Sequence, residues 1–221
     1  MLFPEVIIMQ LLTIDDRYST MPWDQIDNVV FDIGNVLLSF DPPSILKAYV
    51  PDRPDLHPAL MQRIFRSPYW VMMDHGLVTN EGAFELMEHG ADPELIPHIR
   101  YIRDHWIEMK DVVTEGVDAL KLCREKGKRT YILSNYGTGF EHVDAKYDFF
   151  RLFDGKIISY RVKLTKPDPA IYRCLIHTYG LEPSRTLFID DAPANVEAAI
   201  ANDWQALCFN EPGKLRRFMQ G

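Results

Sequence analysis

One stretch near the start of the chain guides the interpretation of the rest: Asn28-Val29-Val30-Phe31-Asp32-Ile33-Gly34-Asn35-Val36-Leu37-Leu38. Its apolar run, residues 29–31, is typical of a strand buried on both faces of a parallel sheet. Asp32 ends the run, and a carboxylate beside a buried strand needs a compensating partner because an unpaired buried charge is costly. Gly34 and Asn35 then favour a tight turn. This stretch alone fits two structures: a strand that ends in an Asx turn, or a carboxylate presented at the ligand-binding edge of an open α/β sheet.

The length and composition of the chain fit one large domain, or one domain that carries an insert. The 221 residues are 47% hydrophobic and 25% charged, which supplies enough apolar material for a sizeable core. The formal net charge of −8 argues against a broad basic surface for nucleic acid. An acidic chain that acts on an anionic substrate would need a metal cation or a few well-placed basic groups. Nothing in the sequence predicts an oligomeric state.

The cysteines and the first residues favour a cytoplasmic protein. Cys123, Cys174 and Cys208 are scattered singly, which predicts reduced and mostly buried thiols. The apolar run 6–12 is too short to span a membrane, and Glu5 with no basic flank makes it a poor signal peptide. Residues 1–26 are assigned to an N-terminal extension, which could be an extra strand, a partner-binding arm or a partly ordered tail.

The segment after the first strand predicts helices without intervening strands. We expect helices over residues 44–49, 55–65, 79–87 and 92–106, from helical apolar spacing and from capping residues before each run. This pattern predicts a small helical domain over 42–112, inserted into a core formed by 27–41 and 113–221.

Strands and helices alternate in the rest of the chain. Strands are expected at 29–31, 130–133, 157–159, 186–189 and 205–209, and helices at 117–126, 139–146, 169–179 and 194–201. Such alternation predicts an α/β fold in which a parallel sheet has helices on both faces.

Polar residues follow three of the predicted strands. They are Asp32, Ser134-Asn135 and Asp190-Asp191. Because the carboxyl ends of parallel strands lie at one edge of the sheet, these residues should converge, and Lys166 in a nearby loop could reach the same edge. Taken singly, Ser134-Asn135 is more typical of a turn, Lys166 of a solvated lysine, and Asp190-Asp191 fits a helix cap equally well. Their joint placement favours a functional site.

These residue types suit phosphoryl transfer. Asp32 and Asp191 could share a Mg²⁺ ion, which prefers oxygen ligands and would attract a phosphate. Asp32 could act as a nucleophile and form an aspartyl-phosphate. The Ser134 hydroxyl could hold phosphoryl oxygens, and Lys166 could neutralise charge in the transition state. Asn195, four residues after Asp191, could orient Asp191 or Lys166.

Four motifs, in order, resemble those of the haloacid dehalogenase-like (HAD) hydrolases. They are Phe-Asp-Ile-Gly-Asn-Val-Leu at 31–37, Leu-Ser-Asn at 133–135, Lys-Pro-Asp-Pro at 166–169 and Phe-Ile-Asp-Asp-Ala-Pro-Ala-Asn at 188–195. The resemblance implies a Rossmann-like three-layer core and Mg²⁺ as cofactor. It also implies that the helical insert is a cap, which closes over the site and selects substrates.

The resemblance also assigns roles to residues. It implies Asp32 as nucleophile, and Mg²⁺ bound by Asp32, by the backbone carbonyl of Gly34 and by Asp191, with Asp190 close to the metal. Phosphate binding falls to Ser134, Asn135 and Lys166.

One position departs from the family pattern. Family phosphatases usually carry a second aspartate two residues after the nucleophile, for acid–base catalysis, and this chain has Gly34 there. The Asp-x-Gly-Asn-Val form and the segment 70–84 resemble a subgroup of glucose-1-phosphate phosphatase-like proteins, related to the phosphatase domain of soluble epoxide hydrolases. Asp41 and Asp74 are candidates for the missing acid–base group, and His75 lies beside Asp74. A metal-bound water with a good leaving group is an alternative.

Three functions remain open at this point. The first is a Mg²⁺-dependent phosphatase of a small phosphorylated metabolite, such as a sugar phosphate. The second is a haloacid dehalogenase, which needs no metal and is disfavoured by the adjacent carboxylates of Asp190 and Asp191. The third is a non-catalytic binding or regulatory protein, for which Gly34 is the best support.

Overall fold

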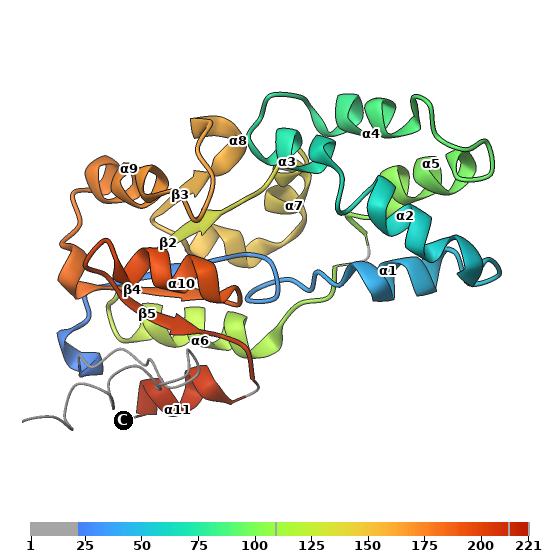
Figure 1. Cartoon of the computed structure of the whole chain (residues 1–221). Coiled ribbons are helices and arrows are strands. Elements are labelled where there is room, and N and C mark those ends of the chain that lie inside the picture. Colours follow the sequence, from blue (N-terminus) through green and yellow to red (C-terminus); the bar gives the residue numbers. More distant parts are fainter. Residues whose placement is uncertain (1–21, 109, 212, 221) are drawn as a thin grey trace, which may run out of the picture.

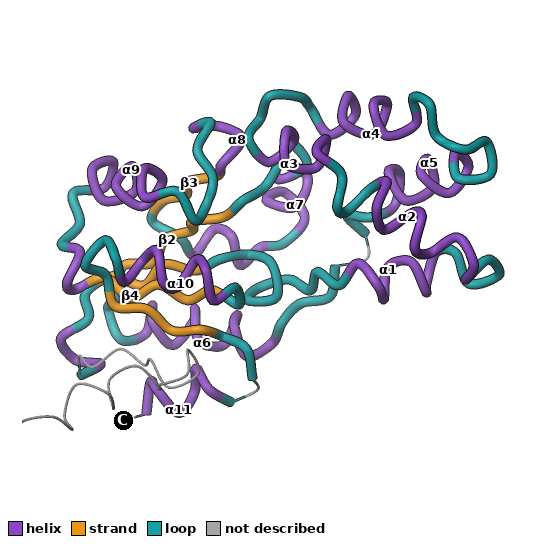
Figure 2. The backbone as a smooth tube through the Cα atoms, in the orientation of Figure 1, coloured by secondary structure: helices purple, strands orange, loops and turns teal. Residues whose placement is uncertain are grey.

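The computed structural model describes residues 22–108, 110–211 and 213–220, and a five-stranded parallel sheet forms the centre of this part of the chain (Figure 1, Figure 2). Its order is β3-β2-β1-β4-β5. The strands are β1 (Asn28–Phe31), β2 (Arg129–Ser134), β3 (Gly155–Ile158), β4 (Thr186–Asp190) and β5 (Gln205–Cys208).

Strand β1 lies in the middle of the sheet, and all its residues are buried. Phe31 pairs in register with Ile132 of β2 and with Ile189 of β4. Polar residues after these positions therefore meet at the carboxyl edge. The chain reverses its direction of strand addition between β1 and β4, and open α/β sheets bind ligands at such a switch point.

Two hydrophobic clusters hold helices against opposite faces of the sheet, because successive strand residues point to opposite sides. One face is covered by α6 (Thr114–Glu125), α7 (Phe140–Lys146) and α11 (Lys214–Gln220), and the other by α9 (Pro169–Tyr179) and α10 (Pro193–Ile200). In β1, Val29 and Phe31 join the first cluster and Val30 the second. The predicted α/β class, with a Rossmann-like sheet between helical layers, is confirmed.

Helices α1 to α5, called the insert here, follow β1 and lie beyond one end of the sheet (Figure 1). They are α1 (Pro42–Tyr49), α2 (His57–Arg63), α3 (Pro68–Asp74), α4 (Asn80–Glu88) and α5 (Ile96–His105), with a 3-10 helix at Pro54–Leu56. The sequence predicted four helices here and missed α3. Ser67 caps α3 by accepting a hydrogen bond from the Trp70 N–H at 3.2 Å, a signal that could have been read.

The two linkers between the insert and the core run side by side. Leu38 and Val112 form an antiparallel bridge, and the Ser39 N–H donates to the Asp111 carbonyl at 2.8 Å. The Asp111 N–H donates in return to the Ser39 hydroxyl at 2.9 Å. The chain therefore leaves and re-enters the core at one place.

Several predicted boundaries change. The helix expected over 55–65 is divided, because Pro58 opens α2 after the first 3-10 turn. The helix expected from Asp92 begins at Ile96, since the Asp92 side chain accepts the Glu94 N–H at 3.1 Å and first closes a turn. The strand expected to include Ser159 ends at Ile158, where α8 (Ser159–Val162) begins.

The sequence did not predict α8, α11 or the 3-10 helices at Trp23–Gln25, Asp148–Leu152 and Pro183–Arg185. Residues 1–21 of the predicted N-terminal extension lie outside the described residues. Cys123 and Cys208 are buried, and Cys174 is partly buried. No helix in the described ranges is both long and apolar enough to cross a membrane.

Candidate active site

A cavity of about 220 Å³ opens at the carboxyl edge of the sheet. The strand ends and core loops line it with Asp32, Gly34, Asn35, Ser134, Asn135, Lys166, Asp191 and Asn195. The insert and the adjoining loops line it with Phe40, Trp70, Met73, Asp74, Trp106, Lys110, Tyr136 and Gly137. Residues that are far apart in sequence thus meet where parallel strands end.

Asp32 lies directly after β1 and is 8% exposed. Its Oδ1 atom is 2.8 Å from the Nζ atom of Lys166. Burial raises the pKa of Asp32 to about 6, against the opposing effects of Lys166 and of a hydrogen bond with Ser134. The charge of Asp190 adds to the rise. Asp32 is therefore a buried carboxylate held by one cation and open to the cavity.

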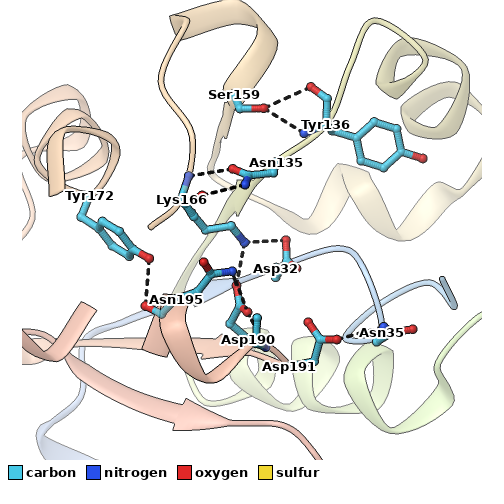
Figure 3. Close-up of polar contacts among 11 residues, drawn as sticks. Asp32, Asn35, Asn135, Tyr136, Ser159, Lys166, Tyr172, Asp190, Asp191 and Asn195 are labelled. Atoms are coloured by element: carbon cyan, nitrogen blue, oxygen red, sulfur yellow. Dashed lines mark hydrogen bonds and ion pairs between the residues drawn. The ribbon is translucent and has the colours of Figure 1, made fainter. Parts of the chain in front are cut away.

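Lys166 joins two carboxylates (Figure 3). Its Nζ atom lies 2.6 Å from Asp190 Oδ2, in addition to the Asp32 contact. Burial acts to lower the pKa of Lys166, but the charges of Asp190 and Asp32 outweigh burial, and the pKa is raised. The ammonium group is thus fixed and charged beside the nucleophile candidate.

Asn135 positions Lys166 through the backbone of that residue. The Asn135 side chain donates to the Lys166 carbonyl at 2.9 Å and accepts the Lys166 N–H at 2.8 Å. These bonds occupy the Asn135 amide, which was expected to bind phosphate. Ser134 is 1% exposed and lines the cavity next to Asp32, in keeping with the expected placement.

Asp190 is fully buried and has donors on both carboxylate oxygens. Oδ1 accepts the Ala192 N–H at 2.8 Å and the Asn195 amide at 3.0 Å. Asn195 was predicted to orient Asp191 or Lys166. From the first turn of α10 its side chain bonds neither of them but reaches back to Asp190, which holds Lys166 (Figure 3). Asn195 therefore acts on Lys166 only through Asp190.

Asn35, a residue that the sequence analysis assigned only to a turn, holds Asp191. Its Nδ2 atom donates to Asp191 Oδ2 at 2.9 Å, and its Oδ1 atom accepts the Phe40 N–H at 2.8 Å. The backbone φ of Asn35 is +52°, a left-handed conformation that asparagine tolerates. Burial raises the pKa of Asp191, and the charge of Asp190 contributes to the rise although Asn35 opposes it.

The acidic cluster is suited to a metal ion. Oxygen atoms of Asp32, Asp190 and Asp191 all lie within 4.8 Å of one another. Carboxylate oxygens are the ligands that Mg²⁺ prefers. Burial raises the pKa of Asp32 and of Asp191, the charge of Asp190 adds to both rises, and a divalent cation would offset this repulsion. The oxygens of Asp190 are already engaged by N–H donors and by Lys166, so Asp32 and Asp191 are the better placed ligands.

Of the two acid–base candidates, the structure brings only Asp74 to the cavity. Asp74 is the last residue of α3, and burial raises its pKa to about 7, with the charge of Asp32 adding to the rise and Lys166 opposing it. Asp41 instead caps α1 by accepting the Ser44 N–H at 3.3 Å, and it lines a different cavity. The proposed role of Asp41 is therefore corrected. His75 lies 3.2 Å from the Thr165 hydroxyl, outside the cavity lining.

Four aromatic residues and Lys110 in the cavity lining belong to none of the four motifs that the sequence indicates. Phe40, Trp70, Trp106 and Tyr136 form a run of ring contacts along the cavity, with centroids 5.7–5.9 Å apart. These residues come from the insert, both linkers and the loop after β2, so no local pattern joins them. The Lys110 side chain lies among them.

A comparison with protein families agrees with this geometry. The model of the haloacid dehalogenase-like hydrolases matches residues 26–203, which is most of the chain. The chain belongs to the haloacid dehalogenase-like (HAD) hydrolases. The resemblance that the sequence motifs predicted is therefore confirmed.

Known proteins similar to this HAD hydrolase include flavin mononucleotide hydrolase 1 of Arabidopsis thaliana, a chloroplast protein. It is 29% identical over 141 residues, which are 56% of this chain and 56% of the relative. The chain spans between about a third and just over half the length of the first curated relatives that it matches.

Solved structures share the fold of this HAD hydrolase. A HAD family enzyme from Bacteroides thetaiotaomicron, a mutant in complex with magnesium and inorganic phosphate, has a TM-score of 0.64 at 21% identity, over 82% of this chain and 93% of that one. L-2-haloacid dehalogenase from Xanthobacter autotrophicus has a TM-score of 0.59 at 17% identity, over 82% of this chain and 76% of that one.

Proposed function

We propose that this HAD hydrolase is a Mg²⁺-dependent phosphatase of a small phosphorylated metabolite. The observation that carries the proposal is the arrangement of Asp32, which faces the cavity 2.8 Å from the Lys166 ammonium and belongs to the same acidic cluster as Asp191. The similar enzyme crystallised with magnesium and phosphate supports this choice over dehalogenation. We further propose that residues 42–112 act as a cap that selects the substrate.

Each residue of the site has a separate role in the proposed phosphoryl transfer. An Asp32 oxygen attacks phosphorus, the bond from phosphorus to the leaving oxygen breaks, and the phosphoryl group becomes an aspartyl-phosphate on Asp32. Ser134 and Lys166 hold the phosphoryl oxygens and stabilise their negative charge. Mg²⁺, held by Asp32, Asp191 and the Gly34 carbonyl, would polarise the phosphoryl oxygens when bound.

Asp74 supplies the proton in this proposal. Its pKa of about 7 places it where one group can donate and later accept a proton near neutral pH. Protonated Asp74 gives its proton to the leaving oxygen. The resulting carboxylate takes a proton from the water that attacks the aspartyl-phosphate, and inorganic phosphate and free Asp32 result.

Hydrolysis of para-nitrophenyl phosphate tests the proposal. We expect Mg²⁺-dependent turnover that chelation with EDTA removes, and we expect Asp32→Asn to lower kcat by about three orders of magnitude or more. Asp27→Asn is the matched control, because Asp27 lies at the opposite end of β1 and pairs with Arg185.

Other outcomes would identify the other functions. Metal-independent and Asp32-dependent turnover of L-2-chloropropionate, without phosphatase activity, would support a dehalogenase. Absence of both activities in the folded protein, across a panel of phosphorylated metabolites, would support a non-catalytic role.

A further inference from the structure

Lys110 carries a buried charge that the proposed reaction does not use. It lies in the linker that returns the chain from α5 to α6, and only 7% of its surface is exposed. Its Nζ atom is 4.8 Å from the ring centre of Phe40, 5.1 Å from that of Trp106 and 5.6 Å from that of Tyr136. The same residues line the cavity that contains Asp32.

The Lys110 ammonium lacks an acceptor of its own. Within the described part of the chain it has no hydrogen bond and no ion pair within 4 Å, and its contacts are the faces of the three rings. Lys166, by contrast, is buried with two carboxylates within 2.8 Å. Ring faces compensate a buried ammonium only in part. In keeping with this, burial lowers the pKa of Lys110 to about 8, while the more distant charge of Asp32 opposes the shift.

Lys110 lies on the part of the cavity wall that would face the leaving group of a bound phosphate ester. The groups assigned to the phosphoryl group, Asp32, Ser134 and Lys166, belong to the sheet edge and core loops. Lys110 and its rings belong to the linkers, to the start of the loop after β2 and to the end of α5. A phosphate ester bound at the sheet edge must direct its leaving group toward the remaining cavity wall, and the unpaired cation of that wall is Lys110.

We propose that Lys110 binds a second anionic group, a carboxylate or a second phosphate, on the leaving-group side of the substrate. The inference rests on the proposed phosphatase function and narrows its substrates to small phosphate monoesters that carry another negative charge. Lys110 is 7% exposed and its side chain lies against three rings, so an ion pair with it would be stronger than the same pair at the surface.

Matched substrates test this site. Phosphoglycolate and 2-hydroxyethyl phosphate have similar size, and only the former carries a carboxylate. We expect wild-type kcat/KM to favour phosphoglycolate, and Lys110→Met to lower it for phosphoglycolate by about ten- to hundredfold, with less than a threefold change for 2-hydroxyethyl phosphate. Lys146→Met is the matched control, because Lys146 lies 5.2 Å from the Tyr147 ring but is exposed and outside the cavity.

A binding measurement keeps the test independent of turnover. Calorimetry with Mg²⁺ would compare 3-phosphonopropionate and 3-hydroxypropylphosphonate, which cannot be hydrolysed. We expect the carboxylate compound to bind wild type at least tenfold more tightly and to lose this advantage in Lys110→Met.

The outcomes separate the two proposals. Equal loss for both substrates in Lys110→Met, or equal affinity of wild type for both phosphonates, would overturn the second-anion site while leaving the phosphatase intact. Absence of hydrolysis of every phosphate ester would overturn the phosphatase. Failure of 3-phosphonopropionate to bind wild type would also overturn the second-anion site.

Discussion

Gly34 stands where family phosphatases usually carry a second aspartate, and the space around it shows whether a side chain would fit. A Cβ atom built on Gly34 would have Asp32 Oδ2 as its nearest neighbour, at 3.8 Å, which is an ordinary van der Waals contact. The space around position 34 therefore admits a Cβ atom and does not by itself require a glycine. The protein instead directs a carboxyl group, Asp74, into the cavity from α3.

The acid–base role of Asp74 predicts a dependence on the leaving group. Asp74→Asn should lower kcat by about a hundredfold for an alkyl phosphate, and by much less for para-nitrophenyl phosphate, whose leaving group needs no proton. Adding Gly34→Asp to this variant should restore part of the alkyl phosphate activity, and Gly34→Ala should not. Equal losses for both substrates in Asp74→Asn would contradict the role.

The buried charge of Lys110 predicts a pH-dependent stability. Its pKa of about 8 in the folded protein is below the ordinary value of 10.5, so the unfolded chain holds more protons between these pH values. The free energy of unfolding therefore rises as the pH increases from about 8 to 10.5. Below pH 8 Lys110 is charged in both states, and the buried charge lowers the stability of the folded protein by its full amount. At pH 7 the free energy of unfolding of Lys110→Met should therefore exceed that of wild type by about 1–2 kcal/mol, after allowance for the lost ring contacts.

Urea denaturation at pH 7 and pH 10 measures this difference. The advantage of Lys110→Met over wild type should shrink at pH 10, because the folded lysine is then mostly neutral. Lys146→Met, which alters an exposed lysine, should match wild type at both pH values. A destabilised Lys110→Met variant at pH 7 would contradict the expected cost.

At the scale of elements, the first turn of α6 fixes the loop that follows β1. A Cβ atom on Gly116 would lie 1.7 Å from the Val36 carbonyl oxygen, so only glycine allows this approach. The Val113 N–H, just before α6, donates to the Leu37 carbonyl at 2.9 Å. The start of α6 therefore packs against the loop that carries Asp32, Gly34 and Asn35 and holds it in place.

Gly116→Ala should displace this contact. We expect a loss of about 3 kcal/mol or more in the free energy of unfolding, because the clash involves backbone atoms that cannot rotate away. Urea denaturation measures it, with Asp118→Ala as the control, since Asp118 is exposed on the same helix. Wild-type stability in Gly116→Ala would show that α6 can move without cost.

At the scale of the whole molecule, Asn80 connects the insert to the core. Its Oδ1 atom accepts the Gly139 N–H at 2.8 Å and the Thr138 hydroxyl at 3.0 Å, and its own N–H donates to Thr138 Oγ1 at 3.0 Å. The Ser159 hydroxyl donates to the Asp74 carbonyl at 2.6 Å close by. These bonds hold the cavity-facing end of the insert against the core.

Asn80→Ala should loosen this connection. The Gly139 N–H would lose its acceptor, so we expect a loss of about 1–2 kcal/mol in stability and faster amide hydrogen exchange in residues 74–82. For the proposed phosphatase, KM should rise several-fold. Glu81→Ala, which alters an exposed neighbour in α4, is the control. Unchanged exchange in Asn80→Ala would contradict a connecting role.

The sequence alone determined the sheet and the edge at which its polar residues meet. Short apolar runs such as 29–31 and 187–189 are typical of buried strands, and parallel strands end at one edge of the sheet. The meeting of Asp32, Ser134 and Asp190 at that edge therefore followed from local patterns. The order of the four motifs also indicated the family, and the match of the HAD hydrolase model to residues 26–203 confirms it.

Tertiary structure decided where the side chains point and what the insert contributes. The pairing of Asn195 with Asp190, the choice of Asp74 over Asp41, and the rings around Lys110 each join residues from separate elements. Such contacts depend on how helices pack and which loop lies above the strand ends, and no local periodicity carries that information. The sequence thus determined which groups reach the site, and packing determined the partner of each.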